Sequence, residues 1–414
     1  MVSINKYEDN LHNNNLLVIY MLVFSTILIP SIKVGSIPAF RVEQLIVILY
    51  LMYFFIKLTV GKKIKKNHSI FAGLYVGFSI FIVLSILVGS FKGIKIVIND
   101  FFELYKVLIY LGVYLITVSI VKSEKDKIKI LNFINFCLLI SVVIAVQQYF
   151  DLFNLNERYV HIIAPTQFRT LVNNYPTPRV IGMTSNPNVY AVMPGIGATI
   201  SWSIYLTTRE KRNILFLVVF ILAVLMTLSR SGFVFMASSI ATFTFLYFKS
   251  SFNFKTLVKG RINLKAIRIL ILSIFILTLL GLIIFNYLPE ELTWRLMRGI
   301  NIQTDSSFQA RLRNWREHID YFKSSPLFGL GPAKSIEYEH HVDNEWLLFL
   351  RQYGVVGCFY ITFTFLSPLI NKKDTFFRNL YLSILVGSAL YMIPAVIYNS
   401  FQIMPLIMIM IGLI

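Results

Sequence analysis

Residues 343–350 read DNEWLLFL, and at this point a polar stretch gives way to an apolar run that continues to Gly357. The polar stretch begins near Pro289 and is rich in arginine, with Arg295, Arg298, Arg311, Arg313 and Arg316. Apolar runs lie on both sides of it, and each has the roughly 20 residues that an α-helix needs to cross the hydrocarbon core of a bilayer. The sequence therefore predicts a long polar loop between two membrane-spanning helices.

The composition of the whole chain is typical of a membrane protein. Of its 414 residues, 56% are hydrophobic and 14% are charged, whereas soluble domains carry about 25% charged residues. The apolar runs are continuous rather than alternating, which favours helices over a β-barrel, because a helix satisfies its own backbone hydrogen bonds in lipid. We predict an all-α, polytopic membrane protein with a single domain over residues 1–414 and about twelve transmembrane helices.

The loops predict the orientation of the chain. We place the spans at residues 16–32, 37–57, 70–90, 101–121, 128–150, 187–206, 213–229, 231–248, 267–288, 344–370, 376–393 and 395–414. Lysines and arginines gather after every even-numbered span up to the tenth, and the positive-inside rule assigns those loops to the cytoplasm. Both termini are then cytoplasmic, and two long loops, 151–186 and 289–343, face outward. The net charge of +19 has the same origin, so we expect no nucleic-acid partner.

Two arginines precede or divide apolar runs on the predicted outer side. Residues 179–188 read RVIGMTSNPN, in which Asn186 suits an N-cap and Pro187 the first helical position. A helix N-terminus binds anions through its free N–H groups, and Arg179 just upstream would complete an anion site. Arg230 lies in the turn between two spans, where a charge is costly and often functional. The alternative for both arginines is a side chain that merely extends to the membrane surface.

Residues 307–322 show the spacing of an amphipathic helix. Its apolar stripe comprises Phe308, Leu312, Trp315, Ile319 and Phe322. Arg313 falls opposite this stripe and Arg316 well off it, so both are predicted to face solvent. Arg311 falls at the edge of the stripe beside Trp315, and it is the one of the three that we expect to be functional. The following PLFGLGP segment, residues 326–332, lacks a Lys-Ser/Thr pair, and we interpret it as a shaped turn rather than a phosphate loop.

Titratable residues lie close together where the span at 344–370 begins: His340, His341, Asp343 and Glu345. Either Asp343 or Asn344 would serve as the helix cap. A carboxylate or an imidazole at this position could take a proton from a sugar hydroxyl. We expect no metal site, because no second histidine lies at a useful spacing, and no cofactor, because neither a Gly-Lys-Ser/Thr loop nor an Asp-x-Asp motif occurs.

Four stretches together resemble the O-antigen ligase and polymerase family of bacterial envelope glycosyltransferases. They are residues 40–44 (FRVEQ), residues 179–188, residues 229–232 (SRSG), and the series Arg311-x-x-x-Trp315, Pro326-x-x-Gly-x-Gly, Asn344 and Gly354-x-x-Gly357. The resemblance implies a donor glycan carried on undecaprenyl pyrophosphate. It also implies that Arg179, Arg230 and Arg311 bind pyrophosphate or sugar, with Asn188, Asn344 and Trp315 as further substrate-binding residues.

The chain departs from this family's pattern at the position before Asn344. Family members often have histidine there, whereas this chain has Asp343, and His341 stands two residues earlier. The general base is therefore open between Asp343 and His341. The many Ile, Lys, Asn and Phe residues suggest a low-GC, Gram-positive bacterium, which has no lipid A core. This favours a polymerase of capsule or exopolysaccharide over a ligase.

The predicted function is the polymerisation of lipid-linked oligosaccharide repeat units on the outer face of the bacterial cytoplasmic membrane. Its partners would be the lipid-linked donor and acceptor, membrane lipids, a flippase and a chain-length regulator. The alternatives are an O-antigen ligase, or a transporter or flippase of the same lipid-linked sugars. Transporters place ionisable residues within their spans, and Glu103 is the main such residue in this sequence.

Overall fold

The computed structural model describes residues 2–31, 41–59, 69–172, 178–251, 306–335, 343–370 and 374–414, and within these ranges every regular element is a helix. The α-helices are α1 (Val2–Leu28), α2 (Val42–Thr59), α3 (Ile70–Phe91), α4 (Phe102–Ile120), α5 (Glu124–Phe150), α6 (Leu155–Ile163), α7 (Phe168–Val172), α8 (Pro187–Thr208), α9 (Arg212–Met226), α10 (Arg230–Ser251), α14 (Ser306–Ser324), α15 (Glu345–Leu366), α16 (Thr375–Tyr391) and α17 (Met404–Gly412). Short 3-10 turns lie at Ile98–Phe101, Leu152–Asn154, Pro165–Gln167 and Ser367–Ile370. The all-α prediction is confirmed for the described residues.

Several helices are built to lie in a membrane. Within the described ranges, six segments are long and apolar enough to cross a bilayer: Ile70–Phe91, Ile98–Ile120, Glu124–Phe150, Pro187–Thr208, Arg230–Lys249 and Glu345–Ile370. Three shorter apolar helices, Asn15–Leu28, Val42–Ile56 and Arg212–Met226, accompany them. A polytopic membrane protein accounts for this set, although twelve full spans are not established. The span predicted at 267–288 lies outside the described residues.

The prediction of a span over residues 395–414 is wrong in its first half. Helix α17 covers only Met404–Gly412, about 14 Å at 1.5 Å per residue, which is too short for the roughly 30 Å hydrocarbon core. The backbone N–H groups of residues 397–399 are bonded to the Glu345 side chain instead of to a preceding helical turn. A carboxylate from another helix therefore holds this segment out of helical geometry.

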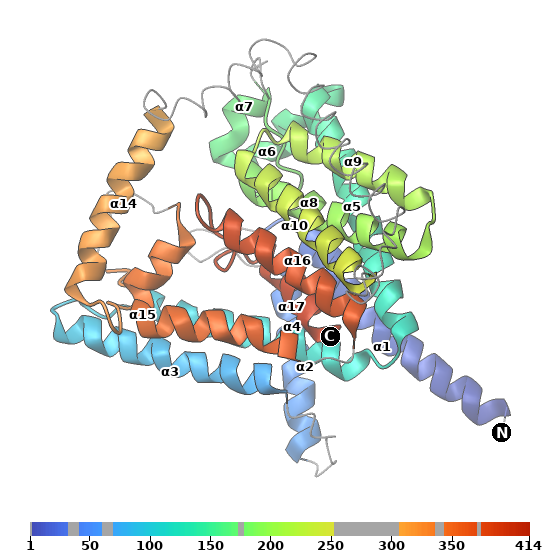
Figure 1. Cartoon of the computed structure of the whole chain (residues 1–414), viewed down its shortest axis with the longest axis horizontal. Coiled ribbons are helices and arrows are strands. Elements are labelled where there is room, and N and C mark those ends of the chain that lie inside the picture. Colours follow the sequence, from blue (N-terminus) through green and yellow to red (C-terminus); the bar gives the residue numbers. More distant parts are fainter. Residues whose placement is uncertain are drawn as a thin grey trace, which may run out of the picture.

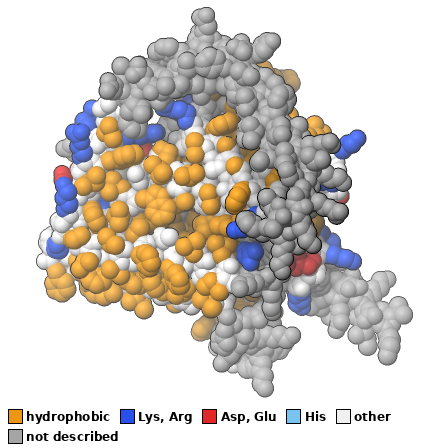
Figure 2. Space-filling view, viewed as in Figure 1, with side chains coloured by type: hydrophobic (Ala, Val, Ile, Leu, Met, Phe, Trp, Pro, Cys, Tyr) orange, Lys and Arg blue, Asp and Glu red, His pale blue; other side chains and the backbone are white. Residues whose placement is uncertain are grey.

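The helices pack in two neighbouring groups (Figure 1). In one group α10 lies along α16 and α8, and α8 packs against α9 and α5. In the other, α15 lies along α3, while α4 contacts α2, α3 and α17. Helix α14 crosses the end of the α3–α15 pair (Figure 1). Figure 2 shows hydrophobic side chains gathered over the face of α3 and α15, as expected for a lipid-facing surface.

Two ends of the bundle can be told apart by charge. Lys127, near the start of α5, forms an ion pair with Asp374, just before α16. The α8–α9 turn, which carries Arg209, Lys211 and Arg212, lies at the far end of α8 from Asn186. Helices α8, α10 and α15 begin at the opposite end, which we call the site end. The described basic residues after the predicted fourth and sixth spans, and Arg378 after the tenth, thus share one end, as expected from the sequence.

Helix α15 is interrupted at Gly354, whose φ of 65° and ψ of −174° are accessible essentially to glycine alone. The PLFGLGP segment supplies the hydrogen bonds that the interruption leaves open. Leu330 and Gly331 donate to the carbonyls of Arg351 and Gln352 at 2.9 Å, and Val355 donates to Pro326 at 2.8 Å. The interpretation of residues 326–332 as a shaped turn is confirmed. The turn follows α14 and is bonded to α15 on both sides of Gly354.

Gly354→Ala is expected to destabilise the protein. The new Cβ would lie 2.2 Å from the Leu327 carbonyl oxygen, and the backbone conformation itself costs about 1–3 kcal/mol for a residue other than glycine. Gly73→Ala in α3 is the matched control, because no other atom lies within 4 Å of its Cβ position. We expect thermal unfolding in detergent to show a lower midpoint for Gly354→Ala only. Equal midpoints would mean that the interruption does not depend on this glycine.

Candidate functional site

The residues singled out from the sequence gather at the site end of the bundle. The segment before α8 is bonded to the α9–α10 turn through Val180 N–H and the Met226 carbonyl, at 3.3 Å. The start of α15 is bonded to the end of α16 through Glu345 N–H and the Met392 carbonyl, at 2.9 Å. Because α10 lies along α16, these contacts bring four segments that are distant in sequence to one place.

Arg179 and Asn188 form the first pair of predicted site residues. The Arg179 Nη2 group donates to Asn188 Oδ1 at 2.9 Å, and Nε donates to the Thr227 carbonyl at 3.0 Å. Asn186 caps α8 by accepting from the Asn188 N–H at 2.8 Å, as predicted. The guanidinium of Arg179 is therefore held against the N-terminus of α8, where free N–H groups and the helix dipole favour an anion.

A buried glutamine shapes the backbone between Arg179 and α8. Gln148, near the end of α5, accepts from the N–H groups of Ile181 and Gly182 at 3.0 and 2.9 Å and donates to the Gly182 carbonyl at 2.8 Å. Gly182 has a φ of +53°, and a Cβ there would lie 2.3 Å from the Tyr190 ring. These contacts fix the chain one to three residues after Arg179 and so limit where its side chain can reach.

Arg311 and Asp343 form the second pair. Arg311 Nε lies 3.4 Å from Asp343 Oδ2, with 27% of the arginine side chain and 53% of the aspartate side chain exposed. An exposed ion pair of this kind contributes at most about 1 kcal/mol. The pair can therefore open at little cost when a stronger anion, such as a pyrophosphate, competes for the arginine.

The buried face of α14 agrees with the predicted apolar stripe except at Ile319. On α14, Ile319 is 39% exposed, whereas His318 is only 1% exposed. Leu312, Trp315 and Phe322 are partly buried as predicted, so the buried face of α14, which packs against α15, is only turned slightly toward His318. Arg311, Trp315 and His318 follow one another at spacings of four and three residues, so they lie on one face of α14. Arg311 and Trp315 are partly buried on that face. Arg313 and Arg316 are exposed, as predicted.

The start of α15 gives three consecutive residues three separate tasks. Asn344 is the N-cap and accepts from the Leu347 N–H at 3.0 Å. Asp343 lies before the cap, and its carboxylate pairs with Arg311. Glu345 is buried and accepts from the N–H groups of Tyr398 and Asn399 at 2.8 and 3.1 Å. The helix cap therefore does not depend on Asp343, which leaves this carboxylate available for chemistry.

Tyr391 connects the two pairs. It is the last residue of α16 and is 1% exposed. Its ring centroid lies 6.4 Å from that of Phe235 on α10, and the carbonyl of the next residue, Met392, accepts from the Glu345 N–H at the start of α15. Both pairs therefore border the same part of the molecule. Arg230 is the first residue of α10 and is exposed at this end, next to a turn in which Ser229 Oγ accepts from the Gly232 N–H at 3.1 Å.

Two predicted features have different outcomes. His341 lies outside the described residues, so its role as a base remains a prediction. Arg41, from the stretch at residues 40–44, forms a buried ion pair with Glu43 and donates to the carbonyls of Thr26 and Ile29 at 3.0 and 3.3 Å. Arg41 thus forms hydrogen bonds with carbonyl groups at the end of α1 and joins this helix to α2, so its role here is structural.

The sequence did not reveal the buried polar network beneath the site. Glu103 pairs with Lys106 on α4 at 2.5 Å and accepts from the Tyr353 hydroxyl at 3.2 Å. Lys106 also donates to Asn399, which in turn donates to Glu345. These contacts explain why Glu103 can lie within a predicted span, because its charge is paired and hydrogen-bonded. The spacing of three residues between Glu103 and Lys106 was the one local signal of the pair.

The fold and this end of the bundle define a polytopic membrane protein with paired arginine, asparagine and carboxylate side chains at a helix-lined surface. A comparison with protein families matches residues 215–362, about a third of the chain, to the family described as O-antigen ligase. Residues 215–362 are thus similar to that family, whose members are membrane enzymes that transfer lipid-linked glycans. The match includes Arg230, Arg311 and Asp343 but not Arg179. No curated protein matches the chain.

Proposed function

We propose that this protein polymerises polyprenyl-pyrophosphate-linked repeat units into a capsular or extracellular polysaccharide on the outer face of the cytoplasmic membrane. The observation that carries the proposal is that the Arg311–Asp343 pair and the Arg179–Asn188 pair both lie at the site end of the bundle, where the segments that carry them are joined through α10 and α16. Together they offer two cationic groups and one weakly held carboxylate at the end of a membrane helix bundle. The similarity of residues 215–362 to the O-antigen ligase family supports the same class of reaction.

The arginines would stabilise the leaving group. When the anomeric bond of the donor breaks, negative charge builds up on the pyrophosphate, and positioned cations stabilise that charge in the transition state. Arg179 is held beside the N-terminus of α8, so one phosphate can meet both the guanidinium and the free N–H groups. The exposed ion pair between Arg311 and Asp343 contributes little free energy, so a second phosphate can draw the Arg311 guanidinium away from Asp343.

Recruitment of Arg311 would also prepare the base. While Arg311 holds Asp343, the guanidinium lies against the carboxylate oxygen Oδ2, at 3.4 Å, and so blocks the approach of a sugar hydroxyl to it. Once the donor pyrophosphate draws the guanidinium away, the carboxylate can accept the proton of the acceptor sugar hydroxyl as that oxygen attacks the anomeric carbon. The proton then resides on Asp343, and the polyprenyl pyrophosphate departs. Arg311 and Asp343 would thus act in sequence: the arginine first binds the pyrophosphate, and the aspartate then accepts the proton.

The proposed side of the membrane is tested by reporters fused within the chain. We expect a reporter at Ser306, directly at the start of α14, to be active outside the cytoplasm, and one at Gly260 to be active inside, as the charge distribution predicts. The measurement is the paired activity of alkaline phosphatase and a cytoplasmic reporter at each position. A cytoplasmic Ser306 would remove the proposed reaction from the side where its substrate is displayed.

The class of reaction is tested by the fate of the precursor. In cells that lack this protein, a polymerase predicts single repeat units on the outer face and the loss of a ladder of longer chains. A ligase predicts that long chains still form but remain attached to the polyprenyl carrier. A transporter predicts that the precursor stays on the cytoplasmic face. Gel analysis of polymer length and side-selective labelling of the precursor separate the three.

A further inference from the structure

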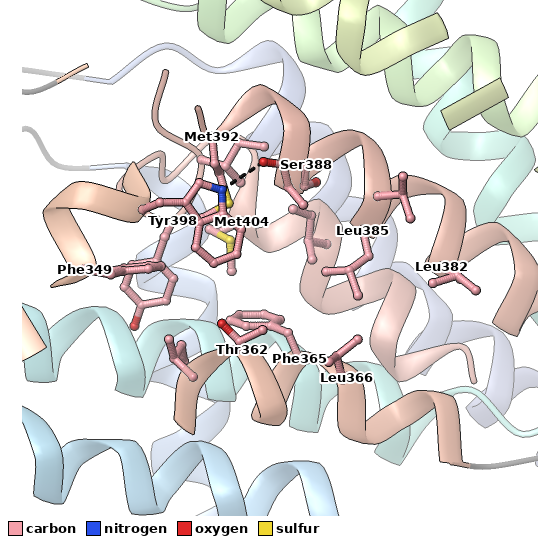
Figure 3. Close-up of a pocket in the computed structure, with 16 residues that line it drawn as sticks. Phe349, Thr362, Phe365, Leu366, Leu382, Leu385, Ser388, Met392, Tyr398 and Met404 are labelled. Atoms are coloured by element: carbon pink, nitrogen blue, oxygen red, sulfur yellow. Dashed lines mark hydrogen bonds between the residues drawn. The ribbon is translucent and has the colours of Figure 1, made fainter. Parts of the chain in front are cut away.

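An apolar pocket lies between α15 and α16 (Figure 3). Phe349, Thr362 and Phe365 line it from α15, and Leu382 and Leu385 line it from α16. Its cavity volume is 210 Å³, larger than the roughly 150 Å³ of an apolar cavity that holds one benzene molecule. The pocket has a polar feature as well: Ser388 Oγ is buried and has no hydrogen-bond partner among the described residues.

The pocket begins at the candidate site. Trp346, which lines one end of it, follows Asp343 by three residues and donates its ring N–H to the Ala389 carbonyl at 2.9 Å. Met392 lines the same region, and its carbonyl accepts from the Glu345 N–H. Glu345 in turn follows Asp343 by two residues, so the Met392 end of the pocket adjoins the start of α15. An anionic group at the site would therefore lie beside the mouth of an apolar pocket.

The pocket extends away from the site along the membrane helices. From Met392 to Leu382, α16 advances about 15 Å, which is about half of the hydrocarbon core. In Figure 3 the lining residues follow this direction, with Met392 and Phe349 at one end and Leu366 and Leu382 at the other. A ligand that fits both parts must have an anionic head joined directly to a long apolar chain.

We propose that this pocket, which we call the α15–α16 pocket, binds the first isoprene units of a polyprenyl pyrophosphate while its head group lies at the Arg311–Asp343 pair. This rests on the proposed function, because that function requires the carrier's phosphates at the same end of the bundle. The pocket would fix the depth and direction of the chain, and so hold the anomeric carbon at a constant height above Asp343. A phospholipid has the same two chemical parts, and the test separates the two.

The test uses the purified full-length protein and a polyprenyl pyrophosphate that carries a photoreactive group near its head and no sugar. We expect the label on peptides containing Leu385 or Thr362, and competition by unlabelled polyprenyl pyrophosphate but not by phosphatidylglycerol. Leu385→Trp fills the pocket and is expected to lower labelling at least tenfold. The control is Leu222→Trp, since Leu222 on α9 is 52% exposed and outside the pocket. If Leu385→Trp fails to insert, Thr362→Phe fills the pocket from α15 instead.

Three outcomes would overturn the proposal: label elsewhere in the protein, equal competition by phosphatidylglycerol, or equal labelling of the two tryptophan variants. A photo-crosslinking amino acid in place of Leu385 adds one more check, because crosslinking only to another segment of this chain would show that the protein itself fills the pocket. Since the probe carries no sugar, binding can succeed even if the protein makes no polymer. A negative result in the labelling test would therefore overturn only the proposal about the pocket, and a failure to make polymer would overturn only the proposed reaction.

Discussion

Arg311→Lys is expected to abolish polymer formation while the protein still inserts into the membrane. The substitution keeps the positive charge but removes the planar fork that can bind two phosphate oxygens at once. Losing one such positioned donor typically costs about 10²–10³-fold in rate. The measurement is the polymer ladder from cells that express equal amounts of each variant, with membrane insertion checked by immunoblot.

Arg313→Lys is the matched control for Arg311→Lys. Arg313 lies two residues further along α14 and is exposed, whereas Arg311 is partly buried and paired with Asp343. We expect the Arg313 variant to form polymer as the unmodified protein does. If the two variants lose the same activity, the surface of α14 acts through its overall charge, and the specific role assigned to Arg311 is wrong.

Features governed by neighbouring residues could be predicted from the sequence. Asn186 and Asn344 cap their helices because a short side chain before a helix reaches the free N–H groups of the first turn. Arg313 and Arg316 are exposed because they lie away from the apolar residues of their own helix. The conjunction of Arg311 with Asp343 was only partly predictable, since both were singled out but nothing local placed them within 3.4 Å.

Features governed by distant partners could not be predicted. Glu345 was assigned to the cluster at the helix start, yet its carboxylate holds residues 397–399, more than fifty positions away. The same contact removed half of the span predicted at 395–414, because apolar composition does not show that a carboxylate will bond the backbone. On α14, Ile319 was expected in the buried stripe but is exposed, and His318 is buried instead, because packing against other helices and not hydrophobicity alone decides which side chains are buried.

Asp343→Asn is expected to lower polymerisation by about 10²–10⁴-fold, the usual effect of losing a general base. The substitution preserves the size of the side chain and removes the carboxylate that accepts the proton. Helix α15 should begin where it does now, because Asn344 and not Asp343 supplies the cap. The measurement is the rate of polymer formation by purified protein from lipid-linked repeat units, alongside the thermal unfolding midpoint.

His341→Gln is the comparison that decides between the two candidate bases. If Asp343 is the base, the His341 variant should retain most of its activity. If the order is reversed, the base is His341 and Asp343 orients it. The pairing of Asp343 with Arg311 adds a third possibility, namely that Asp343 only positions the arginine. In that case Asp343→Asn should raise the KM for the donor more than it lowers kcat, and the loss should not add to that of Arg311→Lys, because both variants would remove one shared function. A fall in kcat at unchanged KM, together with a further loss in the double variant, would assign the proton to Asp343.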